Sequence, residues 1–266
     1  EEANRKQFIQ ALNKPHGIIL ITGPTGSGKS TTLYTALSYL NTPGQKIITV
    51  EDPVEYQLQG VNQIQAKPKI GLTFSSALRS IVRQDPDIIM IGEMRDLETA
   101  KIAVQSALTG HMVLSTLHTN DAAGGLARLL DMGLDDYLLT STVNGILAQR
   151  LVRKLCMYCR EPYQPLPEVM KEKGLTRFLK NDQLTLYHAK GCKECGDIGY
   201  SGRLAIIEFL VMNDAIRKMV MEHKESGLIQ EEAVRGGMLS IYQDGLAKVA
   251  RGMTTLEEVL RVTTEI

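Results

Sequence analysis

Short apolar runs alternate with stretches of helical periodicity through the first half of the chain. The apolar runs predict strands at Gly17–Thr22, Lys46–Val50, Asp87–Ile91 and Met112–Leu117. The helical patterns cover Ser30–Leu40, Ser75–Gln84, Leu97–Leu108 and Ala122–Met132. Asp96 is a predicted N-cap for the third of these helices. Strands that alternate with helices are typical of an α/β fold with a largely parallel sheet.

The composition changes in the second half of the chain. Residues from about Leu155 to about Ser201 contain all four cysteines and many charges, with little periodicity. The residues from Asn213 onward form short helical patterns broken at glycines, and Thr255 with Glu258 predicts a capping box for the last helix. We therefore expect an α/β core over residues 1–150, a metal-stapled insert over 151–205 and a C-terminal helical subdomain over 206–266.

A glycine-rich loop joins the first predicted strand to the first predicted helix. It reads Gly-Pro-Thr-Gly-Ser-Gly-Lys-Ser and matches the G-x-x-x-x-G-K-[ST] pattern of a phosphate-binding loop. Glycines let backbone amides wrap the phosphates, Lys29 supplies charge to the β- and γ-phosphates, and the Ser30 hydroxyl is a magnesium ligand. The residues expected to contact the nucleotide are Gly23, Pro24, Thr25, Gly26, Ser27, Gly28, Lys29, Ser30 and Thr31. The sequence thus predicts a Mg-ATP site.

Acidic residues follow two predicted strands at the edge where α/β sheets bind ligands. Glu93 leaves its strand at this edge, whereas Asp87 enters the same strand at the other. We therefore assign Glu93 to polarising the attacking water or organising the water around Mg²⁺. Glu51, Asp52 and Glu55 follow the second strand and could hold a Mg-bound water or the nucleophile. An ordinary polar loop remains the alternative for both groups.

Two histidines and two arginines are further candidates. His118 follows a strand at the ligand-binding edge, while His111 precedes that strand, about 20 Å away if it is extended. His118 is thus the better candidate for sensing the γ-phosphate, although a structural role stays open for each histidine. Arg79 and Arg83 are four residues apart on a predicted helix, so one face would present both. Such a pair suits the γ-phosphate of a neighbouring subunit, and an ordinary solvated face is the alternative.

Charge and composition narrow the class of protein. Lys and Arg number 30, Asp and Glu also number 30, and aromatic residues make up 5% of the chain without any Trp. This balance argues against nucleic-acid binding as the main task, and it offers few platforms for base stacking. No apolar run approaches the roughly 18 residues of a membrane-spanning helix, and no signal peptide opens the chain. We expect a soluble cytosolic protein.

The four cysteines form two Cys-x-x-Cys knuckles, Cys156 with Cys159 and Cys192 with Cys195. Without export signals, this pattern favours metal binding over disulfides. Two knuckles supply the complete thiolate shell of a structural zinc site, with no open position for catalysis. We expect the metal to stabilise a small module that lacks a core of its own. Four unligated thiols or an iron–sulfur cluster are the alternatives.

Several motifs together resemble the type II secretion and type IV pilus assembly ATPases. They lie at Gly23–Thr32, Val50–Glu55, Leu78–Asp87, Ile91–Asp96 and Thr109–Thr119. The resemblance covers essentially the whole chain. It implies a homo-hexameric, RecA-like Mg-ATP motor in the bacterial cytoplasm, peripheral at the inner membrane. Such a motor docks on inner-membrane platform proteins and adds pilin-like subunits to a pilus or secretion pseudopilus.

The resemblance also implies roles for single residues. It places the acids of both loops and the histidines His111 and His118 at the nucleotide, and it lets Arg79 and Arg83 reach phosphate across a subunit interface. Secretion and pilus-extension relatives carry the four-cysteine insert and retraction relatives lack it, which favours assembly. The amino-terminal domains of the family are absent from this chain, so we expect it to be a fragment.

Two other functions remain open from the sequence. One is a nucleic-acid motor that shares the RecA-like core, against which the neutral charge and the scarcity of aromatic residues count. The other is a nucleotide-dependent scaffold that does not hydrolyse ATP. That function would leave Lys29, Glu93 and both arginines chemically unused.

Overall fold

The computed structural model describes residues 2–179 and 183–263. Contacts divide the chain into two compact units. One, called here the phosphate-loop unit, contains Glu2–Gln149 and Phe209–Met238; the other, the cysteine unit, contains Arg150–Glu208 and the residues from Leu239 onward. The division expected from the sequence, into residues 1–150, 151–205 and 206–266, stays a prediction.

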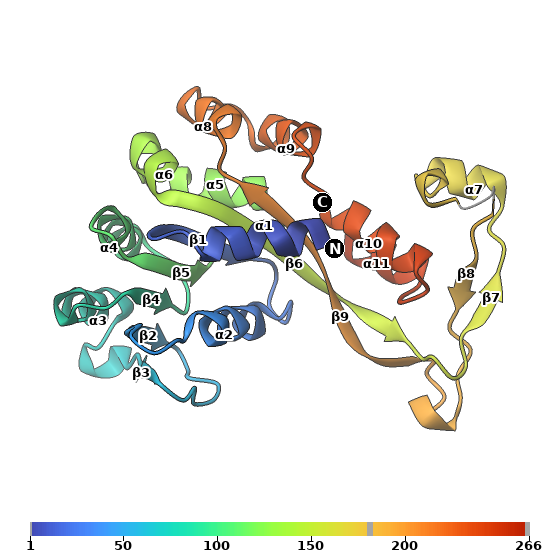
Figure 1. The fold of residues 1–266 in the computed structure, drawn as a ribbon, viewed down its shortest axis with the longest axis horizontal. Coiled ribbons are helices and arrows are strands. Elements are labelled where there is room, and N and C mark those ends of the chain that lie inside the picture. The colour runs from blue at the N-terminus through green and yellow to red at the C-terminus, as the bar shows by residue number, and fades with distance from the viewer. Residues whose placement is uncertain (1, 180–182, 264–266) are drawn as a thin grey trace. The chain divides into compact units, whose positions relative to one another are not determined.

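A seven-stranded sheet has the order β3-β2-β4-β5-β1-β6-β9 (Figure 1). The strands are β1 (Gly17–Thr22), β2 (Ile47–Glu51), β3 (Val61–Gln65), β4 (Ile88–Ile91), β5 (Met112–Thr116), β6 (Val143–Leu155) and β9 (Tyr200–Val211). The pairs that link β3 through to β6 are all parallel. The α/β fold is confirmed, and the four predicted strands agree with β1, β2, β4 and β5 to within one residue at each end.

The central strands are apolar because both faces of a parallel sheet are covered. Every residue of β1, β2, β4 and β5 is buried. The helices of the phosphate-loop unit are α1 (Glu2–Leu12), α2 (Lys29–Leu40), α3 (Phe74–Ile81), α4 (Leu97–Leu108), α5 (Ala122–Asp131), α6 (Asp136–Thr142), α8 (Asp214–Met221) and α9 (Ser226–Arg235). Phe8 of α1 packs edge-on against Phe209 of β9, with ring centroids 5.6 Å apart.

Helix ends follow local chemistry. The Asp96 carboxylate accepts a hydrogen bond from the Thr99 amide at 2.8 Å, which confirms the predicted N-cap of α4. The helix predicted over Ser75–Gln84 is α-helical only to Ile81 and ends in a 3₁₀ turn, because Asp85 adopts a left-handed φ of 52° ahead of Pro86. Arg79 and Arg83 therefore do not share one α-helix. No helix among the described residues is long and apolar enough to cross a membrane.

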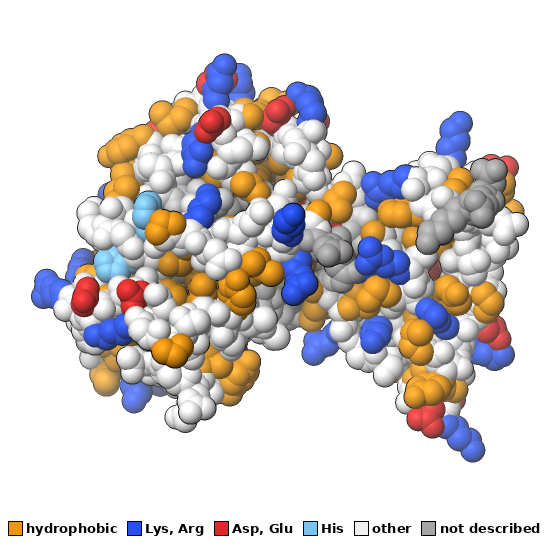
Figure 2. Space-filling model, in the orientation of Figure 1, with side chains coloured by type: hydrophobic (Ala, Val, Ile, Leu, Met, Phe, Trp, Pro, Cys, Tyr) orange, Lys and Arg blue, Asp and Glu red, His pale blue; other side chains and the backbone are white. Residues whose placement is uncertain are grey.

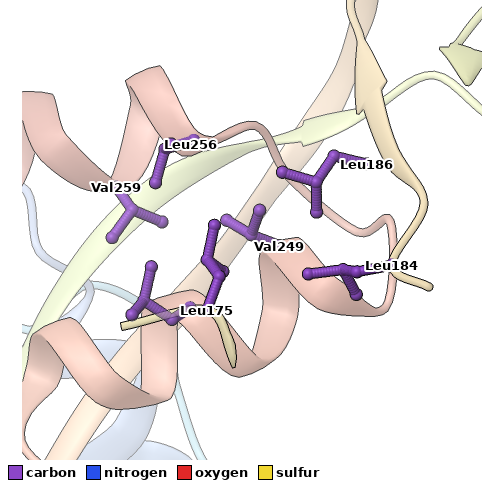
Figure 3. Packing of buried hydrophobic residues seen from close by; sticks show 7 residues of the cluster. Leu175, Leu184, Leu186, Val249, Leu256 and Val259 are labelled. Atoms are coloured by element: carbon purple, nitrogen blue, oxygen red, sulfur yellow. The ribbon is translucent and has the colours of Figure 1, made fainter. Parts of the chain in front are cut away.

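The cysteine unit contains a small core that the sequence did not suggest. It includes the hairpin β7 (Glu161–Tyr163) and β8 (Leu186–His188), and the helices α7 (Pro167–Glu172), α10 (Ile241–Ala250) and α11 (Leu256–Thr263). Figure 3 shows the buried cluster, which consists of Leu175, Leu184, Leu186, Leu246, Val249, Leu256 and Val259. The insert does have a core, because its leucines pack against helices that lie 60 to 84 residues later in the chain. Each fully buried leucine stabilises such a cluster by about 1.5–3 kcal/mol.

One of the two hydrogen bonds of the predicted capping box at the last helix is present. The Glu258 amide donates to the Thr255 hydroxyl at 3.3 Å. The Glu258 carboxylate is directed elsewhere, because it accepts hydrogen bonds from Arg153 and Arg261 at 2.8 to 2.9 Å. The acid thus links β6 to α11 within the cysteine unit.

Candidate nucleotide site and cysteine cluster

The phosphate loop spans residues 23–28, between the end of β1 and the start of α2. Gly28 has a φ of 88°, in the left-handed region that favours glycine. Gly23 has no room for a side chain, since a Cβ there would lie 2.3 Å from the carbonyl oxygen of Gln149. Lys29 Nζ donates to the carbonyl oxygens of Gly23 at 2.8 Å and Pro24 at 3.1 Å, so its ammonium lies over the loop. The loop has the form that the motif predicted.

Glu93 lies within electrostatic reach of Lys29. Burial lowers the pKa of Lys29 below its ordinary value, and the negative charge of Glu93 opposes that shift. The Glu93 side chain is 11% exposed; it forms an ion pair with Arg95, and the His118 Nε2 lies 3.5 Å from it. The structure therefore brings Lys29, Glu93 and His118 to one edge of the sheet, as the strand directions predicted.

Hydrogen bonds between strands hold the turn that carries Glu93. The Gly92 amide donates to the Val50 carbonyl at 2.8 Å, and the Thr116 hydroxyl donates to the Gly92 carbonyl at 2.7 Å. The Met94 amide in turn donates to the Thr116 carbonyl at 3.0 Å. The backbone on both sides of Glu93 is thus tied to β2 and β5, which sets the direction of the carboxylate.

Glu51, the last residue of β2, is buried and already has partners. Its carboxylate accepts hydrogen bonds from the Tyr34 hydroxyl, from the Thr49 hydroxyl at 2.5 Å and from the Gln63 amide at 3.1 Å. Burial, followed by the hydrogen bond to Glu51, raises the pKa of Tyr34 to about 12. Glu51 therefore links α2 to the sheet. Asp52 and Glu55 are exposed in the loop that follows.

The arginines and the second histidine lie elsewhere. Arg79 forms an ion pair with Glu98 in the first turn of α4, and both side chains are more than half exposed. Arg83 is also exposed. His111 lies at the opposite edge of the sheet, because its carbonyl accepts from the amide of Gly17, the first residue of β1. The structure thus does not bring His111 to the chain's own phosphate loop, and the contact with nucleotide that the resemblance implies for it stays a prediction.

Two residues at this edge were missed from the sequence. Arg95 lies two residues after Glu93 and pairs with it. Gln149, near the middle of β6, donates from Nε2 to the Ser27 carbonyl at 2.7 Å and accepts from the Thr32 hydroxyl at 2.8 Å. The sequence signal for Gln149 was weak, since it follows the short apolar run Ile146–Ala148 but stands directly before the charged Arg150.

The four cysteines of the two knuckles meet in the cysteine unit. Their sulfur atoms all lie within 4.8 Å of one another. Sγ–Sγ distances of 3.7 to 3.9 Å are found for the pairs Cys156–Cys192, Cys159–Cys195 and Cys192–Cys195. A tetrahedral ion with metal–sulfur bonds of about 2.3 Å requires sulfurs about 3.8 Å apart. The cluster therefore fits a tetrahedral metal ion.

Backbone amides favour a thiolate at Cys195. Burial by itself raises the pKa of this thiol. The amides of Cys192 and Gly199 donate to its Sγ at 3.2 and 3.3 Å, and together with side-chain hydrogen bonds to Cys159 and Cys192 they lower the pKa to about 7. Because thiolates are the form that binds metal ions, these hydrogen bonds favour the binding form at Cys195.

The chain matches one family model, described as Type II/IV secretion system protein, over residues 1–261. It is 64% identical over 257 residues to Type II secretion system protein E of Xanthomonas campestris pv. campestris, covering 97% of this chain and 45% of that protein. It is 49% identical over 260 residues to Type IV pilus assembly ATPase PilB of Thermus thermophilus, covering 98% of this chain and 29% of that protein. The chain thus spans less than half the length of these two relatives.

A solved structure shares the architecture. The crystal structure of the pilus retraction motor PilT with bound ADP matches with a TM-score of 0.71 at 30% identity, covering 98% of this chain and 66% of that one. The likeness extends over both units of the chain.

Proposed function

This chain belongs to the Type II/IV secretion system protein family, and on that premise we propose that it is the motor part of an ATPase that assembles a pilus or a type II secretion pseudopilus. Its RecA-like P-loop fold is shared with a motor that was crystallised with ADP. The observation that carries the proposal is that the phosphate loop with Lys29, after β1, and the acid Glu93, after β4, lie at the same edge of the parallel sheet, where the charge of Glu93 raises the pKa of Lys29.

The proposed reaction is hydrolysis of ATP by water to ADP and phosphate. The amides of the phosphate loop and Lys29 hold the β- and γ-phosphates, and the Ser30 hydroxyl is a ligand for Mg²⁺. When bound, Mg²⁺ offsets the negative charge that builds up on the phosphate oxygens. Glu93 polarises the attacking water, and His118, 3.5 Å from its carboxylate, is in place to respond to the γ-phosphate.

The acids at the end of β2 and in the loop after it have two different environments. The Glu51 carboxylate is bound to Tyr34, Thr49 and Gln63, so we assign it to holding α2 and the phosphate loop against the sheet. Asp52 and Glu55 are exposed and keep the proposed role of holding Mg-bound water or the nucleophile. Their acceptor oxygens suit the outer hydration shell of a hard cation.

We assign Arg79 and Arg83 to the nucleotide of a neighbouring copy in a homo-hexamer. Both side chains are exposed. An exposed guanidinium can reach a γ-phosphate that another subunit holds, where it stabilises the charge of the transition state. This arrangement predicts that turnover depends on protein concentration.

The four cysteines are proposed to bind zinc. Tetrahedral S₄ geometry favours Zn²⁺, and the sulfur spacing fits bonds of about 2.3 Å. The closed shell leaves no position for catalysis, so the ion's contribution is to the stability of the cysteine unit.

The motor is proposed to work in the cytoplasm, peripheral at the inner membrane through platform proteins. The name of one sequence relative, Type IV pilus assembly ATPase PilB, supports assembly rather than retraction. Nucleic acid is not a proposed partner. On the face drawn in Figure 2, Lys and Arg side chains are scattered among acidic and apolar ones, whereas nucleic-acid binding favours a continuous basic patch.

The test compares Lys29→Ala with Lys101→Ala, a matched loss of an exposed lysine on α4. We expect ATP affinity, measured by calorimetry, to fall at least about tenfold in K29A because a charged phosphate contact is lost, and to stay unchanged in K101A. ATP binding by K29A that equals the unaltered chain contradicts the proposal. Turnover that rises severalfold with DNA or RNA would favour a nucleic-acid motor instead.

A further inference from the structure

Gln149 is a buried amide at the edge of the sheet that carries the phosphate loop. It is 1% exposed, and its neighbours Leu147 and Ala148 on β6 are also buried. Burying an amide costs free energy unless both of its polar groups find partners. Both groups do find partners, and both partners lie in the chain around the phosphate loop. A polar side chain thus occupies a buried position of β6, where it contacts the loop and the helix after it.

The register of the sheet explains this contact. Thr22, the last residue of β1, pairs with Ala148 of the parallel strand β6. The next residues along the two strands are Gly23 and Gln149, so the loop begins beside the amide. The close approach between them excludes a side chain at position 23. Strand β6 therefore supports the loop through both the backbone and the side chain of Gln149.

The hydrogen bond to Ser27 sets the direction of one peptide group. The Ser27 carbonyl and the Gly28 N–H belong to the same peptide plane, and in a trans peptide they point in opposite directions. With the carbonyl held against β6 by Gln149 at 2.7 Å, the Gly28 N–H points away from β6. Such a peptide next to glycine would otherwise rotate easily, because glycine occupies both signs of φ.

The second hydrogen bond joins this peptide to the helix. The Gln149 Oε1 accepts from the hydroxyl of Thr32, in the first turn of α2. The first turn of a helix presents unpaired N–H groups to an anion. One amide therefore holds the loop and the helix start in a fixed relation, and a bound phosphate would contact both.

We propose that Gln149 is a positioning residue of the phosphate loop, which locks the Ser27–Gly28 peptide so that the Gly28 N–H faces the β-phosphate of a bound nucleotide. This inference rests on the proposed function. It follows that Gln149 sets the affinity for nucleotides that carry a β-phosphate and has no effect on the binding of AMP. Because the contact is made with ADP and ATP alike, the affinity changes more than the rate of hydrolysis.

The test uses Gln149→Met, which keeps the length of the side chain and loses both hydrogen bonds. We expect its dissociation constant for ADP, measured by calorimetry, to rise roughly 3- to 10-fold, with AMP binding unchanged. For ATP hydrolysis, KM should rise by a similar factor while kcat stays within about twofold.

Asn144→Leu is the matched control on the same strand. Asn144 is also a buried amide with two hydrogen bonds, to the His16 carbonyl at 2.8 Å and from Lys14 Nζ at 3.2 Å, but these lie at the opposite edge of the sheet. We expect N144L to lower the melting temperature as Q149M does, and to bind ADP like the unaltered chain. This comparison separates positioning from general loss of stability.

Two more variants test the two hydrogen bonds of the Gln149 amide separately. Gln149→Glu still accepts from Thr32 but has no N–H for the Ser27 carbonyl, so we expect it to lose ADP affinity at least as much as Q149M. Thr32→Val removes only the other hydrogen bond and should lose less than Q149E. ADP binding by Q149M or Q149E that equals the unaltered chain, or an equal loss in N144L, overturns the inference alone. Failure of the unaltered chain to bind ADP overturns the proposed function as well.

Discussion

Replacing Glu93 with glutamine removes one charge and almost no volume. The carboxylate lies at the end of β4, is 11% exposed, and contacts Arg95 and His118. Glutamine can still accept a hydrogen bond from either neighbour, so the turn should keep its shape. Arg95 is 69% exposed, and an ion pair with so exposed a partner contributes about 0–1 kcal/mol to stability. The fold should therefore be nearly unaffected.

The expected effect on hydrolysis is much larger. A positioned general base contributes about 10²- to 10⁴-fold to the rate, which corresponds to roughly 3–5.5 kcal/mol of the barrier. The glutamine amide has no lone pair basic enough to take a proton from water. ATP binding should be retained or slightly tightened, because a negative charge near the γ-phosphate is lost. The pKa of Lys29 should fall further, since Glu93 is the group that raises it.

The assay is phosphate release with saturating Mg-ATP over a range of protein concentrations, together with ATP binding by calorimetry. Glu231→Gln, the same chemical change at an exposed position on α9, serves as the control and should turn over normally. If E93Q hydrolyses ATP within about threefold of the unaltered chain, Glu93 is not the base and the reasoning from the strand edge is refuted. Lost binding in E93Q would instead assign Glu93 to holding the nucleotide.

Arg79→Ala should reduce turnover only at concentrations where copies associate; an equal loss in a strictly monomeric sample contradicts action on a neighbouring copy. Cys192→Ser should lose bound zinc, measured by metal analysis, and lower the melting temperature, whereas full zinc content would exclude Cys192 as a ligand. Burial alone would raise the pKa of Glu258, but hydrogen bonds from Arg261 and Arg153 lower it from 4.5 to about 2. The lowered pKa of Glu258 stabilises the fold above pH 4.5, and this stabilisation is lost as the pH falls toward 2. In urea unfolding, Glu258→Gln should therefore lower the free energy of unfolding by about 2 kcal/mol at pH 7 and by little near pH 2. Glu257→Gln, at an exposed position, should change it little at either pH.

The α/β elements were predictable from the local patterns of apolar and polar residues. The phosphate loop is recognisable because its glycines, lysine and serine are consecutive, and the strand before it and the helix after it are set by nearby residues. The direction of each parallel strand follows from the βα alternation, so an acid that leaves a strand must lie at the ligand edge. The strand directions alone therefore predict that Glu93 and His118 lie at the ligand edge and that His111 lies at the opposite one.

Contacts between distant residues were not predictable in this way. The helix over Ser75–Gln84 ended early because of one backbone conformation at Asp85, which the periodic pattern does not contain. Two of the partners of Glu51 come from α2 and β3, and no pattern in the sequence links Tyr34 or Gln63 to that acid. The leucines of the cysteine insert find their core in helices near the end of the chain. Each of these features depends on which elements become neighbours in space.

The sequence by itself determined the chemistry that this chain carries: a phosphate loop, an acid at the end of a strand, and four thiols in two knuckles. These depend on residue type and short spacing, which folding does not alter. Only the tertiary structure decided that β6 lies beside β1 and that Gln149 holds the Ser27 carbonyl, because the order of strands in a sheet is set by packing between segments more than a hundred residues apart.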